Sequence, residues 1–186
     1  MLGDSMLENA NYVNKDRSVT ELVKNYVEAK DYNFYNFAKD GETISTVSHK
    51  ISRLSSNQIQ KLNKQKTHIF LSVGGNDILK LNQPLEASVI VSTFLKYIEL
   101  IKLIKSRLPN AKLIVLNLYT PTASWIEIYR ISIKQWNEAL EQKKTKYHYD
   151  IINVNKLLFD KQDFTHDIEP SVIGGQKIVN EIIMKI

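Results

Sequence analysis

The chain has 186 residues, which is the size of a single domain that can bury a substantial core without disulfides or metals. Hydrophobic residues make up 43% of the sequence and charged residues 24%, which is typical of a globular protein and not of a disordered or fibrous one. There is no cysteine, which excludes disulfides, thiolate metal ligands and a cysteine nucleophile. The net charge of +5 comes mostly from scattered lysines, whereas nucleic-acid binding favours a clustered basic stripe rich in arginine. We therefore predict one domain, residues 1–186, that does not bind nucleic acid.

The sequence also lacks the features of a membrane or secreted protein. No apolar run approaches 18 residues, and the N-terminus has no basic region followed by an apolar stretch. For the chain as given, we expect a cytoplasmic protein with no stable membrane insertion. No pattern indicates its oligomeric state.

Short apolar segments alternate with amphipathic ones along the chain. The segments expected to form helices are 19–28, 43–62, 87–108, 126–141 and 176–185. The segments expected to form strands are 32–38, 67–73, 112–118 and 150–154. This alternation predicts an α/β fold, with a parallel sheet covered by helices on both faces. Another strand should precede Gly3, but only Met1 and Leu2 stand there, so this first strand is very short or truncated.

The six glycines of the chain mark four loops. The loops are Gly3-Asp4-Ser5, Asp40-Gly41-Glu42, Gly74-Gly75-Asn76-Asp77 and the segment 171–175. Each loop follows one of the expected strands. Because the carboxyl ends of strands in an open parallel sheet form its ligand crevice, we expect the four loops to meet at one edge.

The residues in these loops fit nucleophilic catalysis by a serine. Ser5 stands in a glycine-flanked turn, and a serine nucleophile needs a base and donors for an oxyanion. The backbone N–H groups of Ser5 and Gly41, with the Asn76 side-chain amide, are candidate donors. Of the four histidines, only His166 falls in a loop at the expected edge, and Asp163 precedes it by three residues. A histidine base oriented by a carboxylate is the usual partner of a serine.

Taken together and in this order, the four blocks resemble those of the SGNH hydrolases, also called GDSL esterases and lipases. The resemblance covers nearly the whole chain and implies a flavodoxin-like three-layer sandwich with a five-stranded parallel sheet. It also implies that Ser5 is the nucleophile, that His166 is the base, and that Asp163 orients the base. The oxyanion hole would then consist of Ser5, Gly41 and Asn76. The implied activity is hydrolysis of a small acyl or acetyl ester through an acyl-enzyme, without cofactor or metal. Thioesterase, lysophospholipase and deacetylase activities are not separated by these motifs.

The last block departs from the family pattern, in which Asp-x-x-His is followed at once by proline. Here the first proline after His166 is Pro170, which directly follows Glu169. Aligning on this proline places Glu169 at the position of the base and His166 at that of the aspartate. We favour His166 as the base, because the ordinary pKa of a glutamate lies well below that of a histidine. This departure also motivates an alternative function, a catalytically degraded binding protein on the same fold.

Other residues near the predicted crevice have two interpretations each. Tyr119 and Trp125 follow the strand 112–118, where they either line an acyl pocket or cover the sheet edge. Asp4 either fixes the turn before Ser5 or contacts substrate, and Asp77 is expected to be a turn or cap residue. Nucleotide binding at Gly74-Gly75 is disfavoured, because this segment lacks the spacing and lysine of a phosphate-binding loop.

Overall fold

Four parallel strands form the central sheet in the part of the chain that the computed structural model describes, residues 1–80 and 87–186. Their order across the sheet is β1 (Leu2–Gly3), β2 (His68–Ser72), β3 (Lys112–Leu116) and β4 (Asp150–Ile152). Leu2 pairs with Leu71, and Ile69 pairs with Leu113. The parallel α/β architecture and the very short first strand are as predicted.

The expected strand at 32–38 is the main difference from the predicted sheet, because this segment is not a regular strand. Its backbone nevertheless runs beside β1. The Met1 amine donates to the Tyr35 carbonyl (2.7 Å), Phe37 N–H donates to the Met1 carbonyl (2.9 Å), and Lys39 N–H donates to the Gly3 carbonyl (2.9 Å). A two-residue β1 offers too few partners for a complete ladder, so the described sheet has four strands where five were expected, although the path of residues 32–38 is that of a fifth strand.

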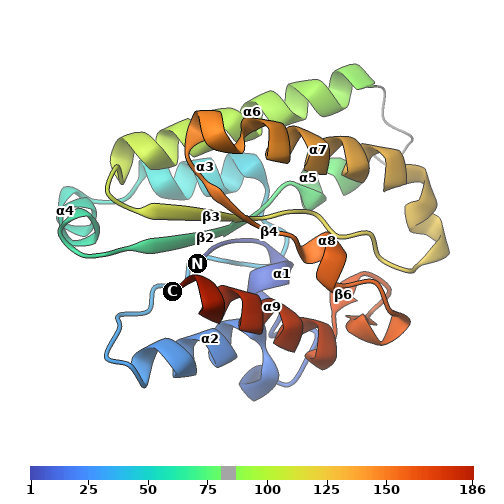
Figure 1. Cartoon of the computed structure of the whole chain (residues 1–186), viewed down its shortest axis with the longest axis horizontal. Coiled ribbons are helices and arrows are strands. Elements are labelled where there is room, and N and C mark those ends of the chain that lie inside the picture. The colour runs from blue at the N-terminus through green and yellow to red at the C-terminus, as the bar shows by residue number, and fades with distance from the viewer. Residues whose placement is uncertain (81–86) are drawn as a thin grey trace.

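Helices cover both faces of the sheet (Figure 1). On one face lie α3 (Ile44–Ser52), α6 (Ala87–Arg107) and α7 (Arg130–Tyr147); on the other lie α1 (Ser5–Glu8), α2 (Val19–Glu28) and α9 (Val172–Lys185). Alternate strand residues serve the two cores, so Leu113 and Val115 pack with the first group while Ile114 and Leu116 pack with the second. The three-layer arrangement follows from this alternation.

The helix predictions hold for 19–28 and 87–108 and need correction elsewhere. The expected helix 43–62 is two helices, α3 and α4 (Ser56–Lys64), because Ser55 and Gln58 form a capping box that starts a new helix. A 3-10 helix, η2 (Ser124–Tyr129), precedes α7, and α9 begins earlier than expected because the Ser171 hydroxyl caps it.

Short elements complete the chain, and most of them flank the carboxyl edge of the sheet. They are η1 (Lys15–Arg17), α5 (Gly75–Leu79), α8 (Val154–Leu157), η3 (Lys161–Asp163), β5 (Phe164–Thr165) and β6 (Glu169–Pro170). β5 and β6 form a small antiparallel hairpin apart from the main sheet. Within residues 1–80 and 87–186, no helix has both the length and the apolar character needed to cross a bilayer.

Candidate active site

Ser5 lies where β1 ends and α1 begins, in a turn that is fastened to the end of β2. Gly3 has a φ of +146°, and a side chain there would collide with the backbone carbonyl of Ser72. The Asp4 carboxylate accepts hydrogen bonds from the Ser72 hydroxyl (2.7 Å) and from the Met6 N–H (3.2 Å), so Asp4 caps α1. These contacts fix the direction in which the Ser5 hydroxyl can point.

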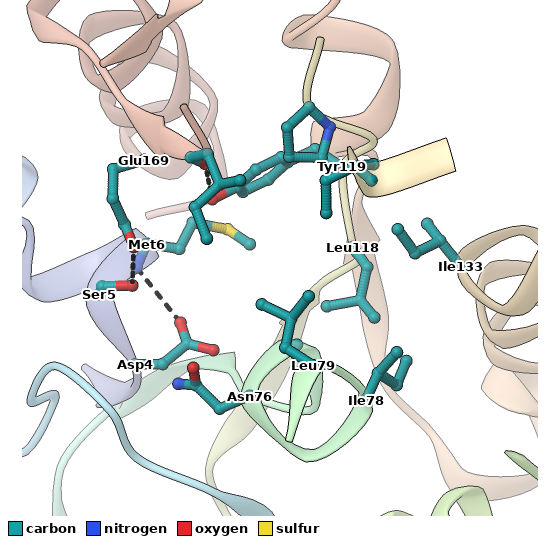
Figure 2. Close-up of a pocket in the computed structure, with 14 residues that line it drawn as sticks. Asp4, Ser5, Met6, Asn76, Ile78, Leu79, Leu118, Tyr119, Ile133 and Glu169 are labelled. Atoms are coloured by element: carbon teal, nitrogen blue, oxygen red, sulfur yellow. Dashed lines mark hydrogen bonds between the residues drawn. The ribbon is translucent and has the colours of Figure 1, made fainter. Parts of the chain in front are cut away.

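The Ser5 hydroxyl donates a hydrogen bond to Oε1 of Glu169 over 3.1 Å. Figure 2 shows the Glu169 carboxyl group directed at Ser5, with Leu79 and Leu118 farther from the serine across the pocket. Both residues are buried, with 9% of Ser5 and 7% of Glu169 exposed. Glu169 belongs to β6, which directly precedes the glycine-containing segment 171–175, so this part of the chain meets the loop that carries Ser5.

The three donors expected from the sequence to hold an oxyanion, the N–H groups of Ser5 and Gly41 and the Asn76 amide, differ in what they bind. Asn76 follows the first residue of α5, and its side-chain amide donates one hydrogen bond to the Glu42 carbonyl (2.9 Å), which leaves its second N–H for a ligand. Among the described residues, neither the Ser5 N–H nor the Gly41 N–H donates to a protein acceptor. Gly41 has a φ of +77° in the turn after the segment that pairs with β1.

Burial changes the acidity of two carboxyl groups at this site. It raises the pKa of Asp4 from 3.8 to about 7, although the hydrogen bonds from Ser72 and Met6 lower it. It likewise raises the pKa of Glu169 from 4.5 to about 7; the hydrogen bond from Ser5 lowers this pKa, and the carboxyls of Asp4, Asp40 and Glu8 raise it. A carboxyl with such a pKa exchanges protons near neutral pH.

His166 lies at the tip of the hairpin formed by β5 and β6. Its backbone is left-handed, with a φ of +46°, and its side chain is exposed. Its Nδ1 lies 3.1 Å from the Thr165 hydroxyl, and its ring meets the Tyr12 ring edge-on at 5.6 Å. Among the described residues it forms no hydrogen bond with Ser5 or Asp163. The hairpin turn therefore carries His166 outward while Glu169 faces the serine.

Asp163 is fully buried and anchors the loop before this hairpin. Nζ of Lys177 lies 2.7 Å from its Oδ1, and its Oδ2 accepts hydrogen bonds from the N–H groups of Phe159 (3.1 Å) and Asp160 (3.0 Å). Burial alone would raise the pKa of Asp163, but these donors hold it below its ordinary value. The expected contact from Asp163 to His166 is thus replaced by one to α9, and Gly174 allows this helix to approach the Asp163 carbonyl closely.

An apolar cavity of about 70 Å³ opens beside Ser5. Ser5, Gly75, Asn76 and Glu169 line its polar side, and the other side consists of apolar residues, among them Ile78, Leu79, Leu118, Ile126 and Ile133 (Figure 2). Tyr119 also lines the cavity, and its hydroxyl donates to the Ile168 carbonyl (2.7 Å). Trp125 does not line it; 45% of this side chain is exposed, and it packs edge-on against Tyr129.

Glu169 is the residue next to Ser5 that was not favoured from the sequence, because the role of base was assigned to His166. Pro170 directly after it was the available signal, since the family pattern places proline behind the base. Among the other residues, Asp4 is a cap, and Asp77 accepts the N–H of Ile44 at the start of α3 (3.0 Å), as expected of a capping residue. The described residues contain no cluster of three or more His, Asp or Glu side chains able to hold a metal ion.

Comparison with known proteins agrees with this architecture. Residues 1–175 match the GDSL-like Lipase/Acylhydrolase family. The chain belongs to this family. It is 23% identical over 208 residues to the uncharacterized protein YpmR of Bacillus subtilis, covering 100% of this chain and 79% of that protein.

Two solved structures share the fold. The lipase Lip_vut3 from a goat rumen metagenome has a TM-score of 0.78 and 18% identity, covering 98% of this chain and 94% of that one. The acetyl-xylooligosaccharide esterase Axe2 from Geobacillus stearmophilus has a TM-score of 0.70 and 12% identity, covering 98% of this chain and 90% of that one. One of these structures is of a lipase and the other of an acetyl-xylooligosaccharide esterase, so the shared fold alone does not define a substrate.

Proposed function

We propose that the chain is a serine esterase that cleaves carboxylic esters through an acyl-enzyme intermediate on Ser5. The oxyanion that forms at the ester carbonyl would be held by the N–H groups of Ser5 and Gly41 and by the Asn76 amide. The single observation that carries this proposal is one cavity lined at once by the Ser5 hydroxyl, the Asn76 amide and a set of apolar side chains. Membership of an acylhydrolase family supports it.

The volume of the cavity limits the length of the acyl chain that it can hold. A water-sized group needs roughly 10–15 Å³ of such space, so a volume of about 70 Å³ holds roughly five of them. We infer a preference for short acyl chains, from acetyl to about hexanoyl. Tyr119 would contact the acyl chain, whereas Trp125 lies outside the cavity and is left without this role.

Hydrolysis of p-nitrophenyl butyrate tests the proposal directly. Purified wild-type protein should turn over the ester and should react covalently with a fluorophosphonate probe. Ser5→Ala should lose the labelling and at least a hundredfold in kcat, because the nucleophile is gone. Absence of both turnover and labelling in the wild type would contradict the esterase.

One observation favours a second function, that of a binding protein without turnover. Ser5 is hydrogen-bonded to a carboxyl group instead of the imidazole that usually activates a serine. In that case the wild type should bind a non-hydrolysable ester analogue in calorimetry yet leave p-nitrophenyl esters intact.

A further inference from the structure

We infer that Glu169, and not a histidine, is the group that takes the proton from Ser5 during ester cleavage. This inference rests on the proposed esterase function and assigns the proton acceptor of that same site. It departs from the Asp-x-x-His pattern that the sequence motif implies.

The hydrogen bonds around Ser5 single out Glu169. Its Oε1 accepts the Ser5 hydroxyl hydrogen, and its Oε2 is buried without any protein donor among the described residues. Asp4 is the other carboxyl at the site, but its Oδ1 already accepts from Ser72 and from the Met6 N–H. Glu169 therefore has free acceptor capacity next to the nucleophile (Figure 2).

The hairpin holds Glu169 in place from two sides. Glu169 pairs with Thr165 across the hairpin, and the Asn9 side chain at the end of α1 donates to the Pro170 carbonyl (2.9 Å). On the other flank, the Tyr119 hydroxyl donates to the Ile168 carbonyl. Asn9 and Tyr119 are thus positioning residues, because they hydrogen-bond to the backbone on either side of Glu169 and not to its carboxyl group.

A carboxylate is usually a poor base for a serine because its ordinary pKa is low, and burial and the charges around Glu169 raise that pKa. Five titratable groups interact electrostatically with the Glu169 carboxyl. They are Asp4, Glu8, Tyr12, Asp40 and Tyr119. The three carboxyls among these neighbours oppose its ionisation, as does burial, and its pKa rises to about 7. A base with this pKa is well matched to proton transfer near neutral pH.

In each half of the reaction, Glu169 takes up one proton and then releases it. As Ser5 Oγ attacks the ester carbonyl carbon, its proton passes to Glu169 Oε1 and the carbonyl π electrons move to the oxygen. Collapse of this intermediate breaks the bond to the alkoxide, which takes the proton from Glu169 and leaves as the alcohol. Water repeats the sequence: it loses a proton to Glu169, attacks the acyl group, and the departing Ser5 Oγ regains the proton.

Two near-isosteric substitutions separate the candidate bases. Glu169→Gln should lower kcat/KM for p-nitrophenyl butyrate by about 10²–10⁴-fold, the usual contribution of general-base catalysis. His166→Gln should stay within about threefold of the wild type, as should His49→Gln at an exposed position of α3. Circular dichroism and thermal unfolding would establish that each variant is folded. The reverse ranking, a large loss for His166→Gln with Glu169→Gln active, would overturn the inference while leaving the esterase intact.

The pH profile distinguishes catalysis from a structural role for Glu169. Wild-type kcat/KM should rise with pH and level off above an apparent pKa of about 7, because only the ionised carboxylate accepts the proton. The residual activity of Glu169→Gln should lack this inflection. An unchanged inflection in Glu169→Gln would contradict the inference, and a wild type without turnover or fluorophosphonate labelling would overturn the inference together with the proposed function.

Discussion

At the scale of single residues, the two buried carboxyls beside Ser5 share a raised pKa but differ in what their oxygens bind. Asp4 is committed to the Ser72 hydroxyl and the Met6 N–H, and this makes it a cap. In the described part of the chain, the Ser5 hydroxyl is the only donor to the Glu169 carboxyl group. An exposed glutamate, with an ordinary pKa of 4.5, would be a poor base for a serine. The buried environment of Glu169 raises this pKa and so suits it to accept the Ser5 proton.

The sequence could indicate the position of some site residues but not of others. Ser5 and Asn76 come within a few residues of the ends of β1 and β2, and Gly41 follows the extended segment beside β1, so their positions near the carboxyl edge follow from the order of these segments. His166 and Glu169 lie on a hairpin whose left-handed turn at His166 and Asp167 decides which side chain faces inward. Spacing alone does not encode that turn, and only Pro170 hinted at it.

Acyl-chain preference depends on single residues in the cavity, and Leu79 is a suitable one to change. Leu79→Phe should fill part of the apolar side and lower kcat/KM for hexanoate esters by about tenfold relative to acetate, since one methylene in a pocket is worth about 10–200-fold. Leu95→Phe, an exposed position on α6, is the matched control and should leave the ratio unchanged. An equal effect of Leu79→Phe on both esters would argue against this cavity as the acyl site. p-Nitrophenyl ester kinetics provide the measurement.

At the scale of elements, most of the longer helices and strands were predictable from periodicity, but several of their ends were not. The amphipathic pattern at 19–28 matches α2 because Ser18 caps it with its side chain. The pattern at 43–62 continues across two helices, and only the capping box at Ser55 breaks it. The segment 32–38 has strand composition, but a ladder needs a partner of comparable length, and β1 has two residues.

The joint between β1 and α1 is the element on which the position of Ser5 depends. Gly3→Ala should lower the free energy of unfolding by about 2–4 kcal/mol, because a side chain there collides with the Ser72 carbonyl and φ is +146°. Gly75→Ala is the control: the nearest atom, Leu118 Cδ2, would lie 3.7 Å from the new Cβ, and the change should stay within about 1 kcal/mol. Urea unfolding of both variants measures the difference. Equal midpoints would mean that β1 and β2 are not packed as closely as described.

At the scale of the whole molecule, buried acids make stability depend on pH in an unusual direction. A carboxyl whose pKa is higher in the folded than in the unfolded state binds more protons when folded, so unfolding becomes easier as pH rises between the two values. For Asp4 and Glu169 this window extends from about 4 to about 7. Asp163 and Glu42, whose pKa values are lowered, act in the opposite direction, and their stabilisation is lost only below this window, as pH falls through their folded pKa.

Removing the charge of Glu169 should therefore stabilise the fold more at high pH than at low pH. The free energy of unfolding of Glu169→Gln minus that of the wild type should increase from pH 4.5 to 7 by about 1–3 kcal/mol and then level off, since one pKa unit corresponds to about 1.4 kcal/mol. Glu127→Gln, at an exposed position, is the matched control for the loss of one negative charge. Urea unfolding at a series of pH values measures both differences. A difference independent of pH would show that Glu169 is ionised equally in the folded and unfolded states, and the raised pKa that suits it to accept the Ser5 proton near neutral pH would then be absent.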